Sequence, residues 1–378
     1  MKRILFFSLT LFGMTLQVWA QMESESRNKG FIEGLFDTAD EVIGFISRDK
    51  WTFIPAITYA PETSLGLGAR AIKVFRHQNA EDSLTRPSTL PITFLYTLNR
   101  QAFLTGELNL WKSENNAYLN ARVELADFPF KFSGIGENVG EMQDELYATR
   151  YFYFHINYEK RIAPGIYIGP RYEFRADDIY EKETGKMLDS GHIPGSDGQR
   201  LSGIGMVLNY DTRDNIFQPA NGAFHQASYM GFHSALGSNF SFSQYVLDFR
   251  KYLTVRPSHV WVGQAWFSFT SGDAPFQHIS LIGGSDVMRG YFEGRFRDRH
   301  AMAYQTEYRL PVHRNLGLVL FGSAGQISPD LSGFRWGKFR YGGGVGFRYK
   351  LNDDGLNIRL DIAVGDQKAF YFGLNEVI

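Results

Sequence analysis

The sequence predicts an all-β protein, a transmembrane antiparallel β-barrel of about sixteen strands preceded by a short N-terminal amphipathic helix. Apolar and polar residues alternate with a period of two from Trp51 onward, as in strands that have one apolar and one polar face. Each alternating run covers about ten residues, the length that a tilted strand needs to cross a membrane. Beyond residue 20 no apolar run is long enough for a transmembrane helix.

The composition supports strands and argues against several other classes of protein. The 378 residues include 33 Phe, 20 Tyr and 39 Gly, which favours strands joined by turns. The 39 Lys and Arg nearly balance the 40 Asp and Glu, so we expect no nucleic-acid partner. The chain has 0 Cys and its 9 His match no metal-binding spacing. We therefore expect no metal, no cofactor and no enzymatic activity.

The N-terminal residues have the order of a secretory signal peptide. Lys2 and Arg3 precede an apolar stretch that runs from Ile4 to Leu16, and Ala20 follows as a small residue suited to cleavage. We predict residues 1–20 to be a cleaved signal peptide, with an uncleaved membrane anchor as the alternative.

Residues 21–50 are predicted to be a periplasmic linker, and residues 51–378 the barrel. Within the linker, residues 30–51 place apolar side chains at helical spacing, which predicts one amphipathic helix. The helix either caps the periplasmic mouth or lies on the membrane, or else it acts as a gate or docks a partner.

The polar faces of the predicted strands distinguish a membrane barrel from a soluble sandwich. A sandwich also alternates, but it turns its apolar face toward its core. Here the polar faces carry many charges, and aromatic residues gather near strand ends, as expected for a barrel with a polar lumen. The charged residues assigned to the lumen include Arg122, Glu124, Arg171, Glu173, Arg175, Glu307, Arg309, Arg340, Arg348, Arg359 and Asp361.

The predicted strands and their connections agree with this architecture. If the first strand runs outward, the long gaps at 126–147, 179–198, 272–298 and 326–336 all fall on the outer side, as in outer-membrane barrels. Residues 77–87 are the one longer connection on the inner side. The sixteen predicted strands are 51–60, 63–76, 88–99, 101–112, 116–125, 148–162, 164–178, 199–211, 221–234, 239–254, 258–271, 299–311, 315–325, 337–350, 355–364 and 370–378.

Two segments carry a more specific signal. Residues 283–296 read GGSDVMRGYFEGRF and end the outer gap 272–298; the matching positions are Gly283, Gly284, Ser285, Met288, Arg289, Gly290 and Tyr291. This segment resembles the signature in the sixth outer loop of the bacterial surface antigen superfamily, which includes BamA-like and TamA-like assembly barrels and two-partner secretion transporters. Residues 208–228 resemble the family's turn between strands eight and nine, through Asp211, Arg213, Asp214, Pro219 and Gly222.

The resemblance covers roughly residues 51–378 and implies a role for the loop arginine. In the family this loop folds into the lumen, and its arginine contacts acids on strands twelve and thirteen. Arg289 is the matching cation and Glu307 the matching acid on strand twelve. The strand-thirteen position is Ser323, which has no charge, so we expect a weaker clamp, or another acid such as Asp361 in its place.

Both motifs allow a structural and a functional interpretation. We interpret the contact of Arg289 with Glu307 as a staple that positions the loop, the alternative being a direct role in moving a substrate. The Asp and Arg of the 211–214 turn are expected to tie down the turn, the alternative being a partner-docking role.

The family resemblance also implies a function and a location. Its assembly factors carry substrate-receiving POTRA domains before the barrel, and residues 21–50 are too few for one. We therefore expect a short member of the family in the outer membrane of a Gram-negative cell. Its expected role is to assist insertion or translocation of proteins, or of lipid, in contact with the lipid bilayer and with periplasmic or outer-membrane assembly proteins. The alternatives are a passive pore for small solutes and a non-transporting partner barrel of a larger complex.

The first and last strands are where the family's insertases open. Here these are the predicted strands 51–60 and 370–378. Gly373 and Asn375 are expected to weaken the last strand, which ends in Val377 and Ile378 rather than in the usual terminal aromatic residue.

Overall fold

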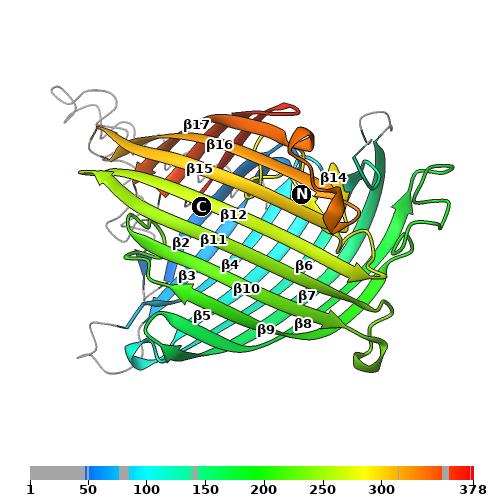
Figure 1. The fold of residues 1–378 in the computed structure, drawn as a ribbon, viewed down its shortest axis with the longest axis horizontal. Helices are drawn as coiled ribbons and strands as arrows, with labels where there is room; N and C mark the ends of the chain where they lie inside the picture. Colours follow the sequence, from blue (N-terminus) through cyan, green and yellow to red (C-terminus); the bar gives the residue numbers. More distant parts are fainter. Residues whose placement is uncertain are drawn as a thin grey trace, which may run out of the picture. The chain divides into compact units, whose positions relative to one another are not determined.

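The computed structural model describes residues 47–48, 51–75, 85–137, 139, 144–313, 315–350, 357–374 and 376–378. Residues 51–378 contain a closed antiparallel barrel of sixteen strands, which confirms the predicted fold class (Figure 1). The barrel strands are β2 (Trp51–Ala60), β3 (Ser64–Phe75), β4 (Ser88–Thr97), β5 (Ala102–Trp111), β6 (Ala117–Phe132), β7 (Glu145–Ala163), β8 (Ile166–Lys182), β9 (Gln199–Asp211), β10 (Gly222–Phe232), β11 (Phe242–Arg256), β12 (His259–Gly272), β15 (His300–His313), β16 (Leu316–Ser328), β17 (Arg340–Lys350), β18 (Asn357–Val364) and β19 (Lys368–Leu374).

The remaining described elements are short. They are the strands β1 (Ser47–Arg48), β13 (Ser280–Ile282) and β14 (Phe296–Asp298), and the 3₁₀ turns η1 (Ser113–Asn115), η3 (Ser234–Leu236), η4 (Leu331–Gly333) and η5 (Trp336–Lys338). None of the helices in the described ranges is long and apolar enough to cross a membrane. The predicted signal peptide, and residues 30–46 of the segment 30–51 predicted to hold the amphipathic helix, lie outside the described residues. The described residues at the end of that segment are in strands, β1 and the start of β2.

Side chains alternate between the lumen and the outer surface as the sequence predicts. In β18, Asn357 and Asp361 are buried at 1% and 0% exposure, whereas Ile362 and Val364 are 46% and 55% exposed. Because a strand repeats every two residues, the charged set enters the lumen and the aliphatic set faces the lipid. Beyond the predicted bounds, β6 and β8 extend by several residues toward the end of the barrel that carries the long connections, which we call the outer end.

Chain neighbours pair through long registers, with one exception. The pair β6 and β7 is in register from Ala117 opposite Lys160 to Phe132 opposite Glu145. Between β19 and β2, which close the barrel, Phe372 opposite Tyr59 is the only partner pair in the described residues. This junction, the seam, is the least paired contact between strands of the barrel.

The last strand is shorter than predicted, because residues 376–378 leave the barrel wall. Phe370 faces outward, so continued alternation would place the carboxylate of Glu376 on the lipid-facing side. A charge there is costly. Instead the side chain of Glu376 lies in the lumen at 3% exposure and pairs with Arg348.

Candidate functional site

A long loop after β12 fills part of the lumen. This inward loop, residues 273–299, contains the small hairpin of β13 and β14. Its apolar side chains pack on lumen residues of β15 and β16. That buried cluster consists of Val139, Ile282, Met288, Tyr291, Phe296, Ala301, Ala303 and Ile327. The loop is therefore a packed part of the barrel interior.

Arg289 is held between two carboxylates of the barrel wall. Its Nη2 donates to Oε1 of Glu307 on β15 at 2.5 Å, and its Nη1 donates to Oδ2 of Asp361 on β18 at 2.5 Å. The guanidinium also lies over the ring of Phe321, 3.6 Å from the centroid. All three charged side chains are at most 2% exposed, so each charge depends on its partners.

Ser323 does not take the place of a strand-thirteen acid. Its hydroxyl donates to the carbonyl of Gly342 at 3.4 Å. The second acid at Arg289 is Asp361, three strands further along the sheet than Glu307. Arg289 thus has two carboxylate partners despite the serine.

Small residues of the wall make room for the loop. A Cβ on Gly342 would lie 2.9 Å from the carbonyl oxygen of Arg289, and one on Gly325 would lie 2.2 Å from Sδ of Met288. Gly290 has φ +98°, and a Cβ there would lie 2.9 Å from the backbone nitrogen of Gly365. The tip of the loop therefore requires glycine both in itself and in the wall it contacts.

Backbone and hydroxyl hydrogen bonds fix the rest of the loop tip. The amide of Gly290 donates to the hydroxyl of Tyr371 on β19 at 3.1 Å, and the hydroxyl of Tyr291 donates to the carbonyl of Tyr341 on β17 at 2.9 Å. The amide of Met288 donates to Oε1 of Gln305 at 3.0 Å. The motif residues from 288 to 291 thus reach β15, β17 and β19.

The first motif residues have a different surrounding. Gly283 bonds to the carbonyl of Val287 and Gly284 to that of Tyr291, which closes a compact turn. Ser285 donates only to the neighbouring Asp286 and faces a cavity. These residues shape the loop surface and contribute no contact to Arg289.

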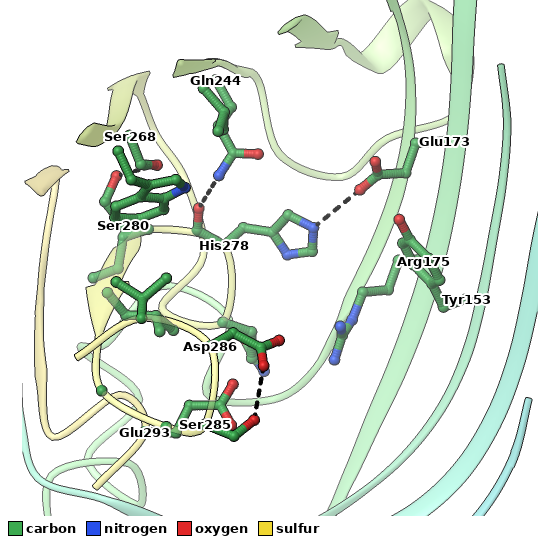
Figure 2. A pocket seen from close by; sticks show the side chains of 18 of the residues that line it. Tyr153, Glu173, Arg175, Gln244, Ser268, His278, Ser280, Ser285, Asp286 and Glu293 are labelled. Atoms are coloured by element: carbon green, nitrogen blue, oxygen red, sulfur yellow. Dashed lines mark hydrogen bonds and ion pairs between the residues drawn. The ribbon is translucent and has the colours of Figure 1, made fainter. Parts of the chain in front are cut away.

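That cavity lies between the inward loop and the opposite wall, and has a volume of about 490 Å³. Figure 2 shows His278 and Asp286 on the loop side, facing Glu173, Arg175 and Tyr153 on the wall. His278 lies 3.6 Å from Glu173, which connects the loop with β8. The cavity lining carries charges of both signs beside apolar side chains such as Trp266 and Leu281.

The second motif forms a turn at the inner end, opposite to the outer end of the barrel. Asp211 accepts from the side chain of Arg213 at 3.0 Å, and also from Arg86 at 2.6 Å. Asp214 accepts from three amides of the turn, those of Asn215, Ala220 and Asn221, at 2.9–3.1 Å. Gly222 has φ +104°, which favours glycine at the start of β10.

Arg309 joins the two motifs inside the lumen. It pairs with Glu307 at 3.0 Å, and its Nη1 donates to the carbonyl of Pro219 in the turn at 3.4 Å. Arg289 and the turn are therefore linked through Glu307 and Arg309. Strand alternation in the sequence predicts that Arg309 faces the lumen. It does not predict that Arg309 connects the two motifs, because Pro219 and Arg309 are 90 positions apart in sequence.

Arg309 also belongs to a closed circuit of charges. Its members are Arg289, Glu307, Arg309, Glu376, Arg348 and Asp361, and we call it the charge ring. Successive contacts measure 2.5, 3.0, 3.7, 2.7, 2.6 and 2.5 Å, and every side chain is at most 8% exposed. The ring connects the inward loop, β15, β17, β18 and the segment after β19. Opposite charges alternate around it, so each buried ion has two partners.

No set of side chains suited to a metal ion occurs in the part of the chain that the structure describes. The lumen chemistry is instead that of paired guanidinium and carboxylate groups with tyrosine and glutamine donors.

Solved structures share this fold. BamA from Haemophilus ducreyi lacking POTRA domains 1–3 aligns with a TM-score of 0.59 and 11% identity, over 87% of this chain and 70% of that chain. CdiB from Acinetobacter baumannii aligns with a TM-score of 0.56 and 10% identity, over 87% of this chain and 60% of that chain. At such identities the likeness concerns the fold.

Two sequence comparisons go further. Outer envelope protein 39, chloroplastic, of Arabidopsis thaliana is 31% identical over 35% of this chain and 40% of its own length, so the match spans less than half of either protein. The Omp85 superfamily domain matches residues 76–377. Because that match covers most of the chain, including both motifs and the charge ring, the chain belongs to the Omp85 superfamily.

Proposed function

We propose that this barrel assists the insertion or translocation of proteins at the outer membrane of a Gram-negative cell, through the seam between β2 and β19. The observation that carries this proposal is the pairing at the seam. Within the described residues it has one partner pair, Phe372 with Tyr59, whereas β18 and β19 pair over seven positions. Few backbone hydrogen bonds must break to part the two strands, and the free edges could pair with an incoming strand.

The surroundings of the seam support the same proposal. The inward loop is fixed to β19 through Tyr371 and to the β2–β3 turn through Glu62, which accepts from the amide of Glu293 at 2.8 Å. Both edges of the seam are therefore tied to one packed element. Separating β2 from β19 would strain these hydrogen bonds, so the inward loop could control the opening of the seam.

The partners in this proposal are inferred from membership of the Omp85 superfamily. The barrel is proposed to work in contact with the lipid bilayer and with periplasmic or outer-membrane assembly proteins, and by a non-enzymatic mechanism. A signal peptide in residues 1–20 would provide its export.

Quantitative proteomics of the outer membrane after depletion of this protein tests the proposal. We expect a defined set of other barrels or surface proteins to fall, and to recover on re-expression. An unchanged protein profile, with the protein itself fully depleted, would count against an assembly role. Lipid asymmetry measured on the same cells separates a role with lipid from a role with proteins.

The luminal cavity of about 490 Å³ supports a second candidate, a passive pore for small solutes. A pore would show a large, steady single-channel conductance in planar bilayers. The packed inward loop favours a small or flickering one, so this recording distinguishes the two candidates independently of the proteomics.

A further inference from the structure

Residues 376–378 occupy a defined site on the lumen wall. Oε2 of Glu376 accepts from Nε of Arg348 at 2.7 Å, and Oε1 accepts from Nδ2 of Asn357 at 3.0 Å. Nη2 of Arg309 donates to the carbonyl oxygen of Ile378 at 2.6 Å. The segment is thus held by three wall side chains, from β15, β17 and β18.

An apolar cup receives the end of the segment. Ile378 is 3% exposed and packs with Tyr252 of β11 and Val260 and Val262 of β12. Ala220 and Phe224, beside the 211–214 turn, complete the surroundings. Polar recognition of Glu376 and apolar recognition of Ile378 therefore lie two residues apart. The first comes from β17 and β18 and the second from β11 and β12, on either side of β15 and β16 in one continuous part of the wall.

The charges of the wall remain unbalanced when the segment is taken away. Arg359 lies 3.9 Å from Asp361, beside the charge ring. Without Glu376, the ion-pair partners of arginines 289, 309, 348 and 359 within the described residues are two carboxylates, Glu307 and Asp361, and Asp286 acts on Arg359 from further away. Buried arginines in excess attract a carboxylate strongly, because little water is present to solvate them.

We propose that this part of the lumen wall is a peptide-binding site for an extended segment with an acidic residue two positions before an aliphatic one, and that residues 376–378 fill it in cis. The inference does not depend on an assembly role, since it concerns binding alone. Such a site keeps the charge ring closed while it is filled. It would be vacant once the end of β19 leaves the lumen.

Competition in trans tests the proposal on the full-length chain. The natural sequence has 0 Cys, so Val262→Cys combined with Ile378→Cys reports docking through a single disulfide. We expect a free peptide with the sequence of residues 374–378 to lower the disulfide yield in purified protein. A peptide with lysine in place of the glutamate is the matched control, and should be without effect.

A second measurement covers the case in which the cysteine pair fails to form. In Glu376→Ala/Ile378→Ser, the chain's own segment no longer fits the site. A fluorescent form of the same peptide should bind this variant at least tenfold more tightly than it binds the wild type. Adding Arg348→Ala should weaken that binding by at least another tenfold.

The two readouts overturn the proposal in clear ways. If the disulfide yield is unaffected by saturating peptide, and the variant binds neither peptide, residues 376–378 are a buried segment and the wall is no peptide-binding site. If both peptides bind equally, the site lacks the acidic selectivity proposed for it. A correctly folded variant is recognised by its unheated mobility in gels.

Discussion

Arg289 and Asp361 are 72 positions apart in sequence, yet a hydrogen bond of 2.5 Å joins Nη1 of the arginine to Oδ2 of the aspartate inside the lumen. The same guanidinium binds Glu307, so one residue of the inward loop connects β15 with β18. The contact is fully buried, and both carboxylates are inaccessible to water.

Replacing the arginine should therefore cost much of the barrel's stability. Arg289→Ala leaves Glu307 and Asp361 without their shared cation, and the loss of one partner from a buried pair costs about 3–5 kcal/mol. We expect a clearly lower temperature for the heat-dependent mobility shift in gels. Arg150→Ala is the matched control, because Arg150 is 63% exposed where it pairs with Asp127, and its removal should leave the heat resistance nearly unchanged.

The same variant separates a staple from a working residue. If Arg289→Ala folds with unchanged heat resistance but no longer supports outer-membrane assembly, the arginine acts on the substrate and not on the architecture.

A second prediction concerns the glycines of the wall that make room for the inward loop. In Gly342→Ala the new Cβ would lie 2.9 Å from the carbonyl oxygen of Arg289, so the loop tip must shift. We expect a loss of about 1–3 kcal/mol in the free energy of unfolding. Gly322→Ala, on the neighbouring strand, places its Cβ no closer than 3.9 Å to any other group and should unfold like the wild type. Equal destabilisation of both variants would point to a general effect of replacing sheet glycines.

The alternation of apolar and polar residues predicts which charged side chains face the lumen. It does not predict which of them form ion pairs with one another. Glu307, Arg309 and Asp361 are assigned to the lumen by strand period alone. Whether Asp361 or another acid reaches Arg289 depends on the stagger between strands around the barrel, which the sequence of one strand does not contain. The sequence could therefore name Asp361 as an alternative partner, but could not select it.

Glu376 illustrates a different reason for failure. The pattern extends β19 to residue 378, which would put this carboxylate on the lipid face. The chain turns into the lumen, where Arg348 and Asn357 donate hydrogen bonds to this carboxylate. Here contacts between distant residues decide the path of the chain. The sequence shows this only as a charged residue, Glu376, at a position where the strand pattern predicts a lipid-facing side chain.

The carboxyl of Glu62 predicts a dependence on pH. This residue lies in the β2–β3 turn at 4% exposure, and burial raises its pKa above 4.5, against the opposing effect of hydrogen bonds from the amides of Glu62 and Glu293. Between the unfolded and folded pKa values the folded barrel binds more protons than the unfolded chain. Its stability therefore falls as pH rises through that range.

Glu62→Gln isolates this effect. The amide retains an acceptor for Glu293 but cannot ionise, so the difference in heat resistance between wild type and variant should favour the variant increasingly as pH rises. Gel mobility shifts measured at several pH values give that difference. Glu293 adds to it in the same direction, because burial, with the charge of Glu62, raises the pKa of Glu293 to about 7 and the variant removes that charge. A difference that stays constant, or that grows toward low pH, would show that the Glu62 carboxylate is well solvated.

A disulfide across the seam gives the last prediction. Tyr59 and Phe372 are the partner pair between β2 and β19, so Tyr59→Cys with Phe372→Cys should form a disulfide on oxidation. If the strands must part during assembly, the oxidised protein should fail to restore the proteome of depleted cells, and reductant should restore it. Leu360→Cys with Phe372→Cys is the matched control, because these residues are partners across β18 and β19, away from the seam. Full activity of the oxidised seam variant would mean that the barrel works without opening there, and a defect in the control as well would trace the loss to the cysteine at 372.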